Sequence, residues 1–127
     1  LIFTGYVKDK NLLAELYHNC YVYVHGHEFG GTNPTMIKAM AYSCAILALD
    51  TIFSREMLRE GKFGLFFKNE VMSITNMIDY CEKEKFIIDK FRSESANGIT
   101  NKYNWDYVAQ DYLKLFKTLI TNRKYVG

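Results

Sequence analysis

Short apolar runs alternate with amphipathic stretches through the first half of the chain, and this order constrains the fold more than any other feature. The apolar runs cover residues 1–7, 20–26, 45–49 and 64–67. Their length and content suit strands of a parallel sheet, which are apolar because helices cover both faces. Helical patterns at 11–19, 34–43 and 54–60 separate them. We therefore predict an α/β fold with a Rossmann-like parallel sheet and flanking helices.

The second half of the chain has a different pattern. Helical stretches cover residues 70–83, 86–101 and 105–121, and no convincing strand follows Phe67. Because periodic apolar positions without strand-like runs indicate helices, we predict a helical C-terminal segment.

Composition limits the class of protein. The 127 residues are 49% hydrophobic and 24% charged, as in one globular domain. A net charge of +2 gives no electrostatic reason to expect nucleic acid as a partner. The three cysteines form no CxxC pair, so we expect neither a disulfide framework nor a zinc knuckle, and a cytoplasmic location. No run approaches the roughly 18 apolar residues of a membrane span, and the opening on Leu1 within an apolar run suggests a fragment of a longer protein.

The stretch "HGHEFGGTNP", residues 25–34, follows the second predicted strand and precedes a helix. Asn33 is a strong N-cap residue and Pro34 suits the first helical position. The free N–H groups and positive end of this helix would face the loop mouth, and Gly30 and Gly31 allow a ligand close to the backbone. We expect an anion here, most plausibly a phosphate. The alternative is a sharp turn with ordinary helix punctuation.

Three side chains of this stretch raise a second question, because His25, His27 and Glu28 could be metal ligands. A zinc site needs a further ligand, and His18, the only other histidine, lies in a helical pattern. We therefore expect no metal, and a hydrogen-bonded or donor-contacting role for the histidines. A carboxylate would repel a phosphate, so Glu28 is better suited to hydroxyl groups attached to that phosphate.

Several segments together resemble a known family. These are "FTGYV", "LLAELYHNCYVYVH", "HEFGGTNPTMIKAMAYS", "AILALD" and "NKYNWDYVAQDYLKLF". In this order they resemble the carboxyl-terminal, donor-binding domain of family 4 glycosyltransferases, with the greatest similarity to bacterial rhamnosyltransferase-like enzymes. The resemblance implies the C-terminal half of a glycosyltransferase B fold. Residues 1–103 would be a partial nucleotide-sugar-binding domain, and residues 104–127 a helix that crosses to a missing N-terminal domain.

The resemblance also assigns roles to residues. Glu28 matches the first acid of the family motif and would contact the sugar as the catalytic residue. The donor-binding positions are His27, Phe29, Gly30, Gly31, Thr32, Asn33 and Lys38. At Lys38 the family has a second acid that holds the ribose hydroxyls, and lysine cannot accept hydrogen bonds as a carboxylate does. Candidate supporting residues are Tyr6, Arg55 and Glu56, although a surface salt bridge explains the last two equally well.

The expected function is sugar transfer from a nucleotide sugar to a glycan or lipid-linked acceptor in the synthesis of surface polysaccharide such as lipopolysaccharide or capsule. The enzyme would work in the cytoplasm, peripheral to the inner face of the membrane, without a cofactor or obligatory metal. This fragment alone should be inactive, because the acceptor domain and an upstream Arg and Lys pair are absent. Two alternatives are a degenerate binding or assembly module, marked by Lys38, and a sugar-nucleotide epimerase.

Overall fold

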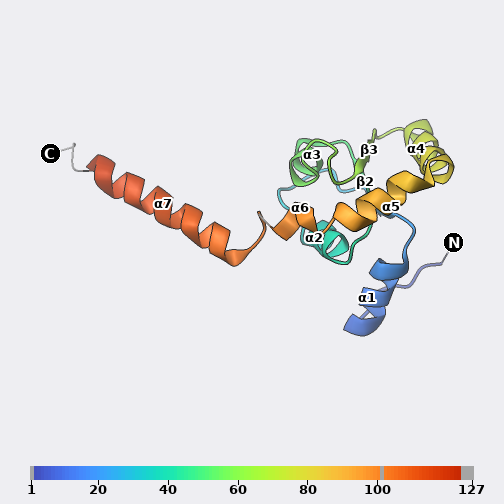
Figure 1. Ribbon diagram of the computed structural model, residues 1–127, viewed down its shortest axis with the longest axis horizontal. Coiled ribbons are helices and arrows are strands. Elements are labelled where there is room, and N and C mark those ends of the chain that lie inside the picture. The colour runs from blue at the N-terminus through green and yellow to red at the C-terminus, as the bar shows by residue number, and fades with distance from the viewer. Residues whose placement is uncertain (1, 101, 124–127) are drawn as a thin grey trace.

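The computed structural model describes residues 2–100 and 102–123 and contains a parallel sheet of three strands (Figure 1). The strands are β1 (Tyr23–His25), β2 (Ile46–Leu49) and β3 (Leu65–Phe67), in the order β1-β2-β3. Tyr23 pairs with Ile46, and Leu47 pairs with Leu65. The sheet has flanking helices and a helical segment follows it, so the predicted fold class is confirmed. An open parallel sheet with flanking helices is also what the resemblance to half of a glycosyltransferase B fold implies.

Helices occupy most of the remaining chain. Their bounds are α1 (Lys10–Asn19), α2 (Pro34–Ala41), α3 (Ile52–Met57), α4 (Val71–Lys83), α5 (Lys85–Glu94), α6 (Asn97–Thr100) and α7 (Trp105–Arg123). Side chains of Asp9, Asn33 and Thr51 accept backbone N–H groups at the starts of α1, α2 and α3. These caps satisfy donors that have no partner within the helix, which explains where the three helices begin.

The single helix predicted for residues 86–101 is divided into α5 and α6, and its predicted end at Asn101 lies outside the described residues. The division accompanies close packing of α6 on α2. A Cβ atom on Gly98 would lie 2.6 Å from Met40 Cε, closer than real side chains approach. The tertiary contact therefore favours glycine here, since a larger residue would displace the end of Met40 and press on the Phe63 ring.

The strand predicted at the start of the chain is wrong for its described part. Residues 2–9 form no helix or strand, while Leu1 lies outside the described residues. Ile2, Phe3 and Tyr6 are almost fully exposed. A strand needs a neighbour for its backbone hydrogen bonds, and this segment has none within the described chain.

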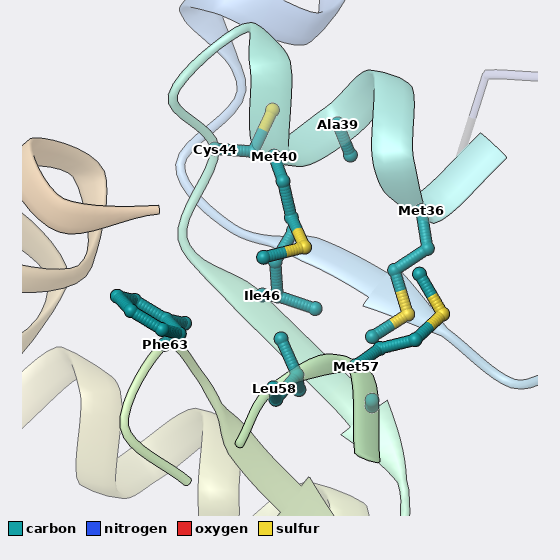
Figure 2. Packing of buried hydrophobic residues seen from close by; sticks show 9 residues of the cluster. Met36, Ala39, Met40, Cys44, Ile46, Met57, Leu58 and Phe63 are labelled. Carbon is teal, nitrogen blue, oxygen red and sulfur yellow. The ribbon is translucent and has the colours of Figure 1, made fainter. Parts of the chain in front are cut away.

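The core lies on both faces of β2, whose four residues are all buried. Ile46 and Ala48 face a cluster that includes Met36 and Met40 of α2 together with Met57, Leu58 and Phe63 (Figure 2). Leu47 and Leu49 pack with Phe67 and with α4 residues on the other face. The alternation follows from the twofold period of a strand, and it places helices on both faces of the sheet.

Helix α7 lies apart from the sheet and its covering helices (Figure 1). All its side chains from Trp105 to Thr121 are exposed. Within residues 2–100 and 102–123, none of the helices has the length and apolar character needed to cross a membrane.

Candidate functional site

The loop of residues 26–33 connects the end of β1 to the start of α2. Its side chains from Gly26 to Thr32 are exposed. Asp50 follows β2 directly, and because parallel strands end at the same edge of the sheet, it lies at the same edge as the loop. Ligands of open α/β sheets bind at this edge, so the predicted loop has the position that an anion site requires.

Asn33 determines how the start of α2 can meet a ligand. Its Oδ1 atom accepts the Thr35 N–H at 2.9 Å, the Met36 N–H at 3.4 Å and the Thr35 hydroxyl at 2.6 Å. Pro34 has no N–H to offer. The expectation of free N–H groups in the first turn is therefore wrong, because the cap already uses them. The positive end of the helix dipole remains.

The loop backbone supplies donors that the helix does not. Within the described residues, the N–H groups of Gly30, Gly31 and Thr32 make no hydrogen bond. Gly30 has a φ of +109°, which only glycine adopts readily. A Cβ atom on Gly31 would have nothing within 4 Å. Unpaired N–H groups beside open space can bind an anion.

Glu28 and His27 are exposed on this loop. Among the described residues, no hydrogen bond or ion pair occupies the Glu28 carboxylate, so it is available to accept from hydroxyl groups. The His27 ring reaches toward Gly30, since its Nε2 atom lies 3.6 Å from the place of a Cβ on that glycine. Phe29, which lies between Glu28 and Gly30 in the sequence, is 77% exposed.

His25 is the buried member of the group, with 7% of its surface exposed. Its ring centroid lies 6.0 Å from that of Tyr23 and 6.0 Å from that of His27. Burial, and then the neighbouring His27, lower the pKa of His25 below its ordinary value. The imidazole is therefore neutral at pH 7 and can offer a single N–H.

Lys38 is exposed on α2, about one helical turn after Pro34. None of the ion pairs within the described parts of the chain involves it. The ammonium group is thus free to contact a ligand or solvent.

Two of the three candidate supporting residues, Arg55 and Glu56, are engaged in ion pairs. Arg55 donates to both Asp50 carboxylate oxygens, at 2.6 and 2.8 Å, and to Glu60 at 3.1 Å. The hydrogen bond from Arg55 lowers the pKa of Asp50. Glu56 pairs with Lys102 at 2.6 Å. Tyr6 is 88% exposed in the segment before α1. Among the described residues, no hydrogen bond links Tyr6 to the loop.

The structure adds residues that pattern analysis missed. The Tyr23 hydroxyl donates to the Thr35 hydroxyl at 3.3 Å, and the Asn33 N–H contacts Met57 Sδ at 3.5 Å. These contacts hold the cap between β1 and the end of α3. In the sequence, the only sign of a role for Tyr23 near the loop is its position two residues before His25, because strand residues two apart share a face.

Comparison with known proteins bears on the same region. A family model described as Glycosyl transferases group 1 matches residues 1–82, a span that includes all three strands, the loop and α2. No curated protein matches the chain. Within residues 2–100 and 102–123, no group of three or more His, Cys, Asp or Glu side chains is placed to hold a metal ion.

Proposed function

The chain belongs to the group 1 glycosyl transferases, and we propose that it binds the sugar donor through the loop of residues 26–33. Membership of this family supports glycosyl transfer as the general activity. The donor would be a nucleotide sugar, whose diphosphate sits against the loop backbone and the start of α2. The unpaired N–H groups of Gly30, Gly31 and Thr32 carry this proposal.

The loop and helix would act on the leaving group. Breaking the bond between sugar and diphosphate places negative charge on the phosphate oxygens, and fixed donors aimed at developing charge lower the barrier. The loop N–H groups and the α2 dipole supply positive potential at this point without a metal. Neutral His25 and the adjacent His27 can donate further hydrogen bonds.

Glu28 would hold the sugar. Its carboxylate is exposed and unpaired within the described chain, so it can accept from two sugar hydroxyls without losing an existing contact. Lys38 would then contact the donor as a cation, in place of the carboxylate that family 4 enzymes use for the ribose.

The finer assignment rests on the resemblance to family 4 and rhamnosyltransferase-like enzymes. It suggests a hexosyltransferase that acts on a glycan or lipid-linked acceptor in surface polysaccharide synthesis, at the cytoplasmic face of the membrane. A further domain would bind the acceptor, and an upstream Arg and Lys would help to hold the diphosphate. This chain by itself would then be inactive in transfer.

Calorimetric titration with uridine and guanosine diphosphates tests the site. We expect binding in the millimolar range, weakened tenfold or more by Gly31→Val, because the side chain would enter space meant for the ligand. Thr118→Val is the control, because it introduces the same side chain at an exposed position of α7, outside the loop. Equal affinities for Gly31→Val and the unaltered chain would remove the loop from the site.

Glu28 needs the intact enzyme for its test. Glu28→Ala should abolish transfer and leave the melting temperature unchanged, because the side chain is exposed and makes no described contact. Unchanged turnover would exclude Glu28 from the sugar site.

A second candidate function is a degenerate donor-binding module, which the exposed and unpaired Lys38 favours. Lys38→Glu separates the two. A large gain in nucleotide affinity would indicate a site that has lost its ribose contact, whereas a loss of affinity would show that Lys38 belongs to a working enzyme.

A further inference from the structure

Cys20 and Cys44 are far apart in sequence but adjacent in the fold, with their Sγ atoms 3.6 Å apart. A disulfide bond is about 2.05 Å long, so the two sulfurs need to approach by about 1.5 Å. Cys20 is partly exposed and Cys44 is fully buried. We propose that this pair is an oxidation site, where a low-molecular-weight disulfide converts the two thiols to a reversible intramolecular disulfide.

The two cysteines lie at the two ends of the segment that carries the candidate site. Cys20 ends α1, and Cys44 lies just before β2. The segment between them contains β1, the whole loop and α2, so a bond would join the two ends of the unit that carries the candidate site. The expected effect is a higher stability of this unit, because a cross-link lowers the conformational entropy of the unfolded chain.

The surroundings hold both thiols in place for reaction. Cys20 Sγ and Cys44 Sγ donate to the same Tyr17 carbonyl, at 3.2 and 2.9 Å. Tyr17 lies in the last turn of α1, where carbonyls have no partner within the helix. Arg92 fixes the same end by donating to the Cys20 carbonyl at 2.7 Å. The reduced thiols thus cap a helix.

The fold places the third cysteine, Cys81, outside this pair. Cys81 lies in a separate cluster with Ala45, Ile88 and Phe91. Cys44 instead belongs to the cluster of Met40, Ile46 and other residues on the opposite face of the sheet (Figure 2). Oxidation should therefore give one defined pairing.

The reaction balances in two exchange steps. The Cys20 thiolate attacks one sulfur of the oxidant, a mixed disulfide forms, and one small thiol leaves with the proton that Cys20 gave up. Cys44 then loses its proton and attacks the Cys20 sulfur, and a second small thiol leaves. Two electrons pass from the cysteine pair to the oxidant.

Exposure sets the order of the two steps. Burial, and then the hydrogen bond with Cys20, raise the pKa of Cys44 to about 12. Cys20 is the partly exposed thiol, so the oxidant reaches it first, and Cys44 Sγ lies 3.6 Å from Cys20 Sγ, within reach of the mixed disulfide. Cys44 is therefore the resolving residue.

The test treats the full chain with glutathione disulfide and measures intact mass, peptide linkage and melting temperature. We expect the loss of two hydrogens, a linked Cys20 and Cys44 peptide pair, and a melting temperature raised by roughly 10 °C. Dithiothreitol should reverse all three. Three intact thiols, a glutathione adduct that never closes, or linkage through Cys81 would overturn the proposal.

Two variants sharpen the result. Cys81→Ala should close the bond as the unaltered chain does, while Cys20→Ser should gain neither the linkage nor the rise in melting temperature. If the melting temperature still rises in Cys20→Ser, the Cys20–Cys44 bond is not the cause of the rise. None of these measurements depends on nucleotide binding, so the outcome is independent of the proposed function.

Discussion

Single residues near the sheet edge differ in what burial and pairing leave them free to do. Arg55 is held by Asp50 and Glu60, and its guanidinium also lies over the Phe66 ring at 5.1 Å. It is therefore not a free anion ligand. His25 carries no described ion pair, yet its burial keeps it neutral at pH 7. The pKa of His25 thus has a consequence for stability.

The first prediction concerns this histidine and pH. Its pKa in the folded state is below the unfolded value of about 6.5, so the unfolded chain binds more protons in the window below that value. The free energy of unfolding should fall as the pH drops from 7.5 to 5, by at most about 1.4 kcal/mol per pH unit. Urea denaturation across this range measures it.

His25→Gln should flatten this dependence, whereas exposed His27→Gln should retain it. The pairing of Asp50 with Arg55 does not interfere, because a carboxylate with a lowered pKa loses its stabilising effect only below about pH 4. A free energy of unfolding that stays constant from pH 7.5 to 5 would contradict the assignment.

At the scale of elements, the approach of β3 to β2 depends on a glycine. A Cβ atom on Gly64 would lie 2.8 Å from the Ile46 carbonyl oxygen and 2.9 Å from Leu58 Cδ1. Because the first of these atoms belongs to the backbone of the central strand, it cannot move aside without disturbing the sheet. The contact fixes the start of β3.

The second prediction follows from this contact. Gly64→Ala should lower the free energy of unfolding by about 2 kcal/mol, as overpacking of a core does. Gly26→Ala has open space and should change it by less than about 0.5 kcal/mol. Urea midpoints compare the two, and equal midpoints would show that the strands separate at little cost.

At the scale of the whole molecule, α7 is the element without packing partners in the described chain. Its exposed apolar side chains include Tyr107, Val108, Tyr112, Leu115, Phe116 and Leu119. The rings of Tyr112 and Phe116 lie 6.1 Å apart on the helix surface. Large exposed apolar surfaces mark sites of interaction, and this surface suits the proposed contact with an acceptor-binding domain.

The third prediction separates α7 from the core. Tyr112→Ser combined with Phe116→Ser should leave the melting temperature of this chain unchanged, because neither side chain is buried. Met36→Ala, at a fully buried position, should cost about 2–5 kcal/mol. In a protein that also contains the proposed acceptor-binding domain, the double substitution should lower the melting temperature. A lower melting temperature in this chain would mean that α7 packs on the sheet.

The sequence by itself determined the features that rest on local physics. The order of strands and helices from β1 onward followed from hydrophobic periodicity, except for the division between α5 and α6. The start of α2 followed from the capping chemistry of Asn33 and the fixed φ of Pro34. The loop at the carboxyl end of β1 was predictable for the same reason, because a strand, two glycines and a helix cap lie next to one another in the chain.

Only the tertiary structure decided which groups remain free and which are neighbours. It left residues 2–7 without a strand, satisfied the first N–H groups of α2 within the cap, and engaged Arg55 and Glu56 in ion pairs. It also placed Cys20 beside Cys44. The contacts of Glu56 with Lys102 and of Cys20 with Cys44 join segments distant in sequence, and patterns along the chain carry no information about such contacts. The Asn33 cap and the Arg55–Asp50 pair are local, but they depend on side-chain geometry that the order of residue types does not specify.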